Sequence, residues 1–191
     1  MRGLGTAGVG NGSFAEAVLF PAGSAPKSVV VGDFNEDGIS DLAVSSNNLR
    51  ILLGNGTAGK GDGTFQTPVS YSVGSTPNHL AIGDFNADRI TDIAVANSGA
   101  SSVSVLLGNG AAGVGDGTFG VANTVASGSG PNGVSVGDWN ADGVSDIAIA
   151  NNNASKVASV LLGNGNGTFE PAQTFAAQTS PSAVGLGDYN E

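Results

Sequence analysis

Short apolar segments alternate with clusters of glycine, asparagine and proline along the whole chain. Within the first complete unit this pattern predicts four β-strands, at Ser28–Phe34, Asp41–Ser46, Leu49–Leu53 and Thr64–Val73. No segment has the spacing of apolar residues that is typical of an amphipathic helix. The pattern therefore predicts an all-β fold.

The pattern repeats with a period of about 50 to 55 residues. An acidic motif begins at four aspartates that are 51, 54 and 50 residues apart, Asp33, Asp84, Asp138 and Asp188. A Gly-x-Gly-[Ser/Thr]-Phe turn keeps a similar step and ends at Phe14, Phe65, Phe119 and Phe169. We expect a partial repeat at 1–27, complete repeats at 28–78, 79–132 and 133–182, and a truncated repeat at 183–191.

A unit of four short strands cannot bury both faces of its sheet alone, so it must stack on copies of itself. This requirement predicts a β-propeller of four-stranded blades that is incomplete in one chain, with about 3.5 repeats. The alternative is a β-sandwich built from the same strands, but a sandwich does not need so regular a period. Because a closed ring takes at least about four blades, we expect exposed strand edges, which favour self-association as a homodimer.

All eleven aromatic residues occupy repeated positions. Four lie inside the acidic motif, at Phe34, Phe85, Trp139 and Tyr189, and four end the glycine turn. The remaining three follow that turn by six residues, at Phe20, Tyr71 and Phe175. We expect these rings to fill the space between neighbouring blades.

The amino-acid composition excludes several classes of partner and site. The net charge of −10, with only six Lys and Arg residues, excludes a nucleic-acid partner. No apolar run approaches the ~18 residues of a membrane helix, so membrane insertion is not expected, and no signal peptide is visible. The absence of cysteine excludes disulfides and thiolate ligands. Ten aspartates, out of sixteen acidic residues, lie in the four copies of the acidic motif.

The acidic motif places oxygen donors at alternate positions of a short loop. Asp, Asn and Asp occupy positions 1, 3 and 5, glycine permits a tight turn at position 6, and Asp returns at position 9. With the main-chain carbonyl of position 7, this set suits a hard cation such as Ca²⁺. The predicted ligands are Asp33, Asn35, Asp37, Ile39 and Asp41 in loop 1, Asp84, Asn86, Asp88, Ile90 and Asp92 in loop 2, and Asp138, Asn140, Asp142, Val144 and Asp146 in loop 3.

Two alternatives compete with a calcium loop. An EF-hand is excluded because it needs flanking helices and a glutamate at position 12. An Asx-rich turn without metal would also select these residues, but three adjacent aspartates repel one another without a cation, so a metal-free loop should be frayed. Loop 2 has Arg89 in place of glycine, which predicts strain if its φ is positive and a weaker or absent metal. The fourth copy contains only Asp188 and Asn190 and cannot form a site within this sequence.

The motifs GDFNEDGISDLAV, GDFNADRITDIAV and GDWNADGVSDIAI resemble the calcium loop and following strand of the FG-GAP repeats, also called VCBS-type repeats, of integrin α-subunit propellers and many secreted bacterial proteins. The resemblance covers almost the whole chain. It implies a seven-bladed, calcium-stabilised propeller, usually extracellular or at the cell surface, that serves adhesion or ligand binding.

The function that we expect is a non-enzymatic, calcium-dependent, secreted interaction module with a protein or carbohydrate ligand. One alternative is the scaffold part of a larger secreted enzyme, a lyase or hydrolase, and another is a purely structural array. His79 is the only histidine, and no Gly-x-Ser-x-Gly sequence accompanies it, so hydrolase chemistry is not expected. The Gly-x-Gly-x-x-Gly sequences that begin at Gly54 and Gly108 are followed by turns rather than helices, which argues against nucleotide binding.

Overall fold

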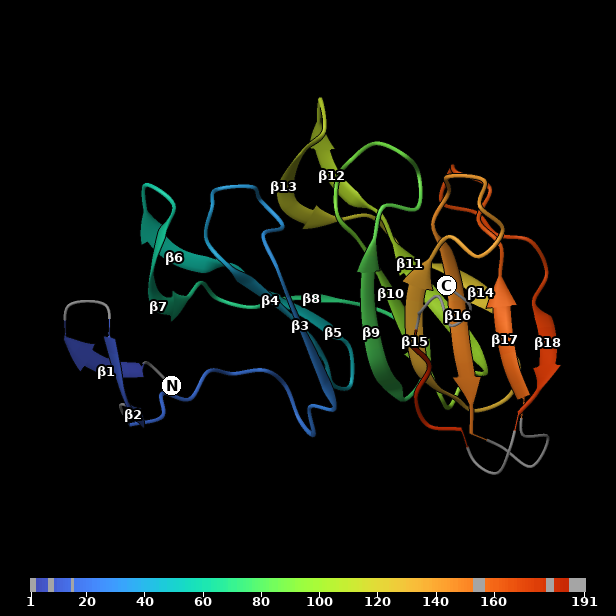
Figure 1. Cartoon of the computed structure of the whole chain (residues 1–191), viewed down its shortest axis with the longest axis horizontal. Coiled ribbons are helices and arrows are strands. Elements are labelled where there is room, and N and C mark those ends of the chain that lie inside the picture. The colour runs from blue at the N-terminus through green and yellow to red at the C-terminus, as the bar shows by residue number, and fades with distance from the viewer. Residues whose placement is uncertain (1–2, 7–8, 15, 153–156, 178–180, 186–191) are drawn as a thin grey trace.

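The computed structural model describes residues 3–6, 9–14, 16–152, 157–177 and 181–185. Within these residues the protein contains strands, turns and bends and no helix, so the all-β prediction is confirmed (Figure 1). No helix among them could therefore cross a membrane.

Three four-stranded antiparallel sheets form the blades of the propeller. In each blade the strands pair in the order in which they occur along the chain, so that every blade is a meander. Blade 1 contains β3 (Ser28–Gly32), β4 (Asp41–Ser45), β5 (Leu49–Leu52) and β8 (Val69–Tyr71). Blade 2 contains β9 (Pro77–Gly83), β10 (Asp92–Asn97), β11 (Ser102–Leu106) and β14 (Asn123–Ala126). Blade 3 contains β15 (Pro131–Gly137), β16 (Asp146–Asn151), β17 (Val157–Leu161) and β18 (Gln173–Ala176).

A two-stranded hairpin separates the third and fourth strands of blades 1 and 2. These hairpins are β6 (Gly54–Thr57) with β7 (Lys60–Phe65), and β12 (Gly108–Ala111) with β13 (Val114–Phe119). A similar hairpin, β1 (Gly3–Thr6) with β2 (Val9–Phe14), precedes blade 1. In blade 3 a single bridge between Gly163 and Phe169 closes the equivalent turn.

The predicted outer strand Thr64–Val73 is therefore wrong as one element. Its first residues belong to the hairpin, in which Gly54 pairs with Phe65 and Thr57 pairs with Lys60. Only residues 69–71 pair with β5. The glycine-rich segment before Phe65 looks like a turn in the sequence, but it folds back and pairs with itself. The other three predicted strands of blade 1 exist and end one or two residues earlier than expected.

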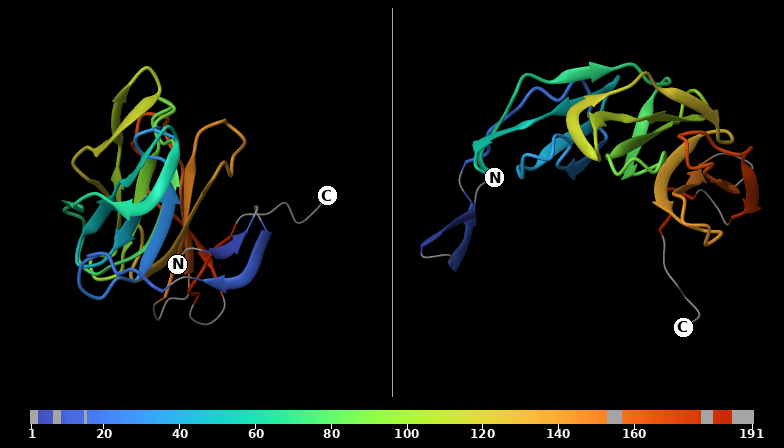
Figure 2. Two further views of the ribbon diagram at one scale, coloured as in Figure 1. Left: turned by 90° about the vertical axis from the view of Figure 1, so that its left-hand side faces the viewer. Right: turned by 90° about the horizontal axis from the view of Figure 1, so that it is seen from above.

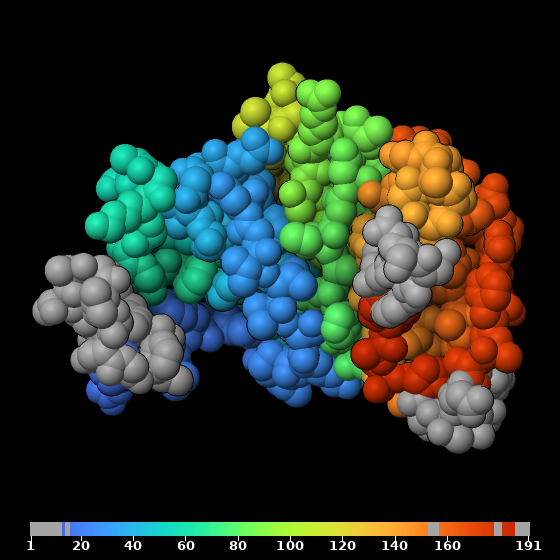
Figure 3. Space-filling view, in the orientation of Figure 1, coloured from blue at the N-terminus to red at the C-terminus, as the bar shows by residue number. Residues whose placement is uncertain are grey.

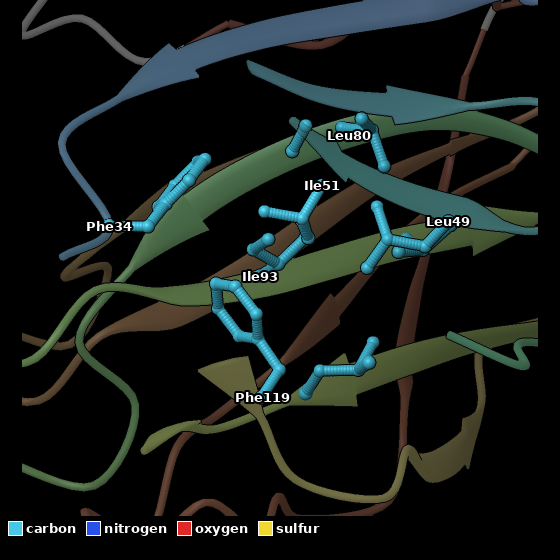
Figure 4. Packing of buried hydrophobic residues seen from close by; sticks show 9 residues of the cluster. Phe34, Leu49, Ile51, Leu80, Ile93 and Phe119 are labelled. Carbon is cyan, nitrogen blue, oxygen red and sulfur yellow. The ribbon is translucent and has the colours of Figure 1, made fainter. Parts of the chain in front are cut away.

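The hydrophobic core lies between the blades. One cluster joins Phe34, Ala43, Leu49 and Ile51 of blade 1 to Leu80, Ile93, Val95, Leu106 and Phe119 of blade 2 (Figure 4). A second cluster joins blades 2 and 3 in the same way, through Phe85, Ala94, Ala96, Val103 and Val105 on one side and Val134, Ile147, Ile149 and Leu161 on the other. Burial of each large side chain contributes about 1.5 to 3 kcal/mol, so these interfaces stabilise the stack.

The strand β10 shows how one sequence serves both interfaces. All six of its residues are buried, and successive side chains point to opposite faces of the sheet. Ile93 and Val95 belong to the cluster with blade 1, whereas Ala94 and Ala96 belong to the cluster with blade 3. The small alanines leave room for Ile147 and Ile149 of the next blade.

The aromatic residues fill these interfaces only in part. Phe34 and Phe85 are 3 % and 1 % exposed, as expected, and their ring centroids lie 5.6 Å from those of Phe119 and Phe169 respectively. In contrast, Trp139 is 36 % exposed and Phe175 is 52 % exposed. The expectation that they are core residues is wrong for the described structure, because no described blade follows blade 3.

The blades follow one another along an arc (Figure 2), and neighbouring blades are in contact along their length (Figure 3). The first strands β3, β9 and β15 lie next to one another. A polar ladder links their beginnings: Ser45 Oγ donates to the carbonyl of Asn78, the Asn78 side-chain amide donates to Asn132, and the Asn132 amide donates to the carbonyl of Ser182.

Candidate metal-binding loops

The acidic motifs that begin at Asp33, Asp84 and Asp138 each form the loop between the first and second strands of their blade. The loop precedes the second strand and the hairpin follows the third. Because these two strands are antiparallel, the loop and the hairpin lie at the same end of the sheet. Figure 1 shows the three loops at the upper edge of the molecule. In loop 1 the hairpin β6–β7 lies directly over Ile39, whose side chain contacts the positions that Cβ atoms on Gly54, Gly56 and Gly61 would occupy.

Backbone amides close loop 1 around its first three donors. The Asp33 carboxylate accepts hydrogen bonds from the amides of Asp37 and Gly38, at 3.1 and 2.8 Å. Asn35 Oδ1 accepts from the Asp37 amide, and Asn35 Nδ2 donates to Asp37 Oδ2 at 3.0 Å. Asp37 Oδ1 in turn accepts from the amide of Ile39 at 2.8 Å. The loop thus brings Asp33, Asn35 and Asp37 together, as the spacing predicts.

The aspartate at position 9 makes different contacts. Asp41 is fully buried, and its two carboxylate oxygens accept hydrogen bonds from the amides of Phe34 and Gly54, both at 2.7 Å. Burial raises the pKa of Asp41, these two hydrogen bonds oppose the increase, and the charges of Asp33 and Asp37 add to it. Asp92 and Asp146 are equally buried and bridge the loop to Gly108 and Gly163. A carboxylate has about four acceptor sites, so two amide hydrogen bonds leave capacity for a cation.

Within the described residues, no three His, Cys, Asp or Glu side chains are arranged around one metal position. The contacts explain this arrangement, because amide N–H groups are the positive partners of the carboxylates, and the two oxygens of Asp41 are directed to the amides of Phe34 and Gly54. The predicted ligand set also includes an amide oxygen and a main-chain carbonyl. The loops therefore gather the oxygen donors that Ca²⁺ prefers in a compact, hydrogen-bonded form.

Loop 2 has a similar hydrogen-bonding pattern, except that one oxygen of the Asp84 carboxylate has no hydrogen-bond partner. Arg89 has a φ of +69°, in the region where Gly38 and Gly143 have +81° and +85°. The backbone strain expected for a side chain at this position is therefore present. The Arg89 amide donates to Asp84 Oδ2 at 2.9 Å, but Asp84 Oδ1 is buried and has no hydrogen-bond partner. A buried, unpaired carboxylate oxygen is costly, and a cation would satisfy it.

Loop 3 repeats the geometry of loop 1 in a more exposed setting. The Asp138 carboxylate accepts from the amides of Asp142 and Gly143, at 3.1 and 2.8 Å. Asn140 Nδ2 donates to Asp142 Oδ2 at 2.7 Å. The motif beginning at Asp188 lies outside the described residues. The structure thus gathers positions 1, 3 and 5 in all three described loops, and it places position 9 against the backbone.

Sequence reasoning missed the contact between each loop and the next blade. The Gly117 amide donates to the carbonyl of Phe34 at 3.0 Å, and the Gly167 amide donates to the carbonyl of Phe85 at 2.8 Å. Both glycines belong to the Gly-x-Gly-Thr-Phe turn of the following blade. The recurrence of that turn was the available signal, but only the fold shows that it lies on the preceding loop.

The only histidine of the sequence lies on a strand and not in these loops. His79 is exposed on β9, where it is paired with Ala96.

Comparison with known proteins agrees with this geometry. A family model described as an FG-GAP-like repeat matches residues 84–149 and 138–191. These two overlapping matches span residues 84–191, more than half of the chain. The search of curated proteins found no match. The matched regions contain loops 2 and 3 and the strands β10, β15 and β16, and the chain belongs to the FG-GAP-like repeat family.

Proposed function

We propose that this β-propeller is a calcium-binding, extracellular interaction module that binds a protein or carbohydrate ligand and catalyses no reaction itself. One observation carries the metal part of the proposal: Asp84 Oδ1 is buried in loop 2 without a hydrogen-bond partner. The loops supply only oxygen donors, which favours Ca²⁺ over softer metals. The bound ion would neutralise carboxylates that otherwise repel one another.

The ligands would be the residues that the three loops gather. Asp33, Asn35, Asp37 and Asp41 act with the carbonyl of Ile39 in loop 1, and the equivalent residues act in loops 2 and 3. Asn35 would present its Oδ1, which lies inside the loop near the Asp37 amide, to the ion. Extracellular modules bind Ca²⁺ at about 10⁻⁴ to 10⁻³ M, which matches a location outside the cell.

Calorimetric titration with CaCl₂ tests the metal part of the proposal. We expect binding in the range of about 10⁻⁴ to 10⁻³ M, with MgCl₂ binding more weakly. The variant Asp84→Asn should lose one site and leave the others in place. A titration with no heat of binding at any calcium concentration up to 10 mM, confirmed by an unchanged melting temperature, would overturn this part.

The interaction part rests on the arrangement of the loops and hairpins. The three loops and the hairpins β6–β7 and β12–β13 lie at the same end of the blades (Figure 1), where a ligand could contact several repeats at once. A glycan array and a pull-down from extracellular extracts, each in CaCl₂ and in EDTA, test it. Calcium-dependent capture supports the proposal, and no capture in either assay favours the purely structural alternative.

Self-association is supported by the two ends of the stack. Val29 and Val31 on β3 are 56 % and 58 % exposed, whereas Leu80 and Val134, which occupy the position of Val29 in the next two repeats, are buried against the preceding blade. At the internal interfaces, the equivalent face is covered by a blade of the same type. We propose that a second copy supplies it, through the blade 3 face that carries Trp139.

Light scattering on the 191-residue chain tests self-association. A dimer that is lost in Val31→Glu and kept in Ser70→Glu, on the outer strand β8, supports it. A monomer at all concentrations overturns it.

A further inference from the structure

Phe34, which lies between the candidate ligands Asp33 and Asn35 of loop 1, forms hydrogen bonds through both its amide and its carbonyl. The Phe34 amide donates to Asp41 Oδ2 at 2.7 Å within the loop, and the Phe34 carbonyl accepts the 3.0 Å hydrogen bond from Gly117 of the next blade. Because this carbonyl belongs to the peptide that carries Asn35, the contact with the next blade fixes the direction of that peptide. Loop 2 has the same pair of contacts at Phe85, with Asp92 and Gly167.

The contact is close, and a side chain at these positions would be crowded or strained. A Cβ atom on Gly117 would lie 2.9 Å from Leu53 Cδ1 and 3.2 Å from Asn35 Cβ, and a Cβ atom on Gly115 would clash with the Phe34 carbonyl oxygen. A Cβ atom on Gly167 would lie 2.8 Å from Leu107 Cδ1. Gly117 and Gly167 also have positive φ values, +79° and +78°. These glycines thus allow the backbone of one blade to lie directly on the loop of another.

Loop 1 has one additional link to the next blade. The Gly115 amide donates to Glu36 Oε1 at 3.3 Å. Loops 2 and 3 have Ala87 and Ala141 at this position, with φ values of +60° and +59°, close to the +51° of Glu36. Alanine therefore fits the backbone at position 36, and the Glu36 side chain can be removed without altering the loop.

We propose that Gly117 and Gly167 are positioning residues for the calcium loops of the preceding blades, so that calcium binding and blade docking stabilise each other. The inference rests on the proposed calcium function and adds its coupling between repeats. The docked turn holds the loop in its compact form and lowers the cost of ordering it around the ion. Linkage requires the reverse effect, so a bound ion also strengthens the docking of the next blade.

Residue-resolved NMR titration with CaCl₂ tests the coupling. The amides of Gly38, Arg89 and Gly143 report separately on loops 1, 2 and 3. We expect Gly117→Ala to weaken binding at loop 1 about fivefold and to leave loops 2 and 3 unchanged, because the added Cβ displaces the turn and lengthens or breaks its backbone hydrogen bond to Phe34. Gly167→Ala should weaken loop 2 and spare loop 1. Loop 3 serves as the reference in both variants.

A second pair of variants does not change the docked glycines. Glu36→Ala should weaken binding at loop 1 about twofold. Glu36→Gln also removes the charge but keeps an acceptor oxygen for the Gly115 amide, so it should bind calcium more tightly than Glu36→Ala. In the unaltered chain, calcium should slow hydrogen exchange of the Gly117 amide. Asp33→Asn should remove this protection at Gly117 and keep it at Gly167.

The outcomes separate the two proposals. If no loop amide shifts with calcium, the proposed calcium function fails. If the loops bind calcium but both glycine variants keep the original affinities, or calcium leaves exchange at Gly117 unchanged, the coupling is wrong. Should Gly117→Ala fail to fold, the exchange measurement and the Glu36 variants decide the question.

Discussion

The buried carboxylate of Asp92 accepts a 2.8 Å hydrogen bond from the amide of Gly108, the first residue of the hairpin β12–β13. Its other oxygen accepts from the Phe85 amide at 2.7 Å. One side chain thus connects the acidic loop, the second strand of the blade and the hairpin. Asp41 and Asp146 make the same connection in blades 1 and 3.

This position predicts how the stability of the calcium-free protein depends on pH. Burial raises the pKa of Asp92 from 3.8 to about 6, with the two amide hydrogen bonds opposing the increase and the charges of Asp88 and Asp84 adding to it. Between these values the folded state holds a proton that the unfolded state has lost. The free energy of unfolding in EDTA should therefore decrease as the pH rises from about 4 to about 6.

Urea unfolding at several pH values measures the effect. Asp92→Asn should reduce the slope without abolishing it, since the pKa of Asp41 is also raised. A slope that is the same in the variant would contradict the assignment to Asp92.

The strained residue of loop 2 gives a second prediction. A non-glycine residue in the left-handed region costs about 1 kcal/mol, so Arg89→Gly should raise the free energy of unfolding by about that amount. Gly143→Ala is the matched reverse change, because a Cβ atom there would meet nothing within 4 Å and tests the backbone cost alone. Urea denaturation in EDTA should show opposite signs for the two variants, and equal signs would argue against strain at Arg89.

Chelation tests the stabilising role of the ion. A ligand at a hundred times its dissociation constant stabilises the folded state by about 2.7 kcal/mol per site, so EDTA should lower the melting temperature by several degrees. Asp33 and Asp138 also accept two amide hydrogen bonds each. Their replacement by asparagine should therefore be judged by the difference between calcium and EDTA. Each variant should lose part of this difference, and an EDTA-insensitive melting temperature in the unaltered chain would refute calcium stabilisation.

The blade interface gives a prediction that does not depend on metal. Phe119 is 6 % exposed and its ring contacts both Phe34 and Tyr71, at centroid distances of 5.6 and 5.7 Å. Phe119→Ala should lower the free energy of unfolding by about 3 to 5 kcal/mol, the usual cost of a large aromatic cavity. Phe175→Ala is the control on an exposed ring and should cost less than about 1 kcal/mol. Comparable losses in urea denaturation would show that burial between blades is not the cause.

Much of this fold could be predicted because the same local residue patterns recur in each repeat. The strands that begin at Ser28, Asp41 and Leu49 and the loop donors at Asp33 and Asn35 follow from local patterns of residues, and these patterns recur. The hairpin β6–β7 could not be predicted in this way, because its glycines also fit an open turn and only pairing with Phe65 distinguishes the two. The exposure of Trp139 depends on a neighbouring blade, which no local pattern contains.

In the candidate site too, local spacing predicts some features, whereas others depend on contacts between distant segments. Spacing alone brings Asp33, Asn35 and Asp37 together, since alternate side chains of a tight loop face one centre. The orientation of Asp41 toward the amides of Phe34 and Gly54 depends on a hairpin that begins 13 residues later. The contact from Gly117 to Phe34 joins residues far apart in the sequence, and it follows only from the order of the blades.

The amide ladder from Asn78 through Asn132 to Ser182 has a consequence for how repeats are added to the stack. Apolar interfaces tolerate sliding, since Leu, Ile and Val contacts have little directional preference. The directional side-chain amides of Asn78 and Asn132, near the starts of β9 and β15, set a single axial offset between neighbours. A repeat with a polar residue at this rung can therefore be appended in one alignment only, and arrays of different length built from such units would share the same pitch.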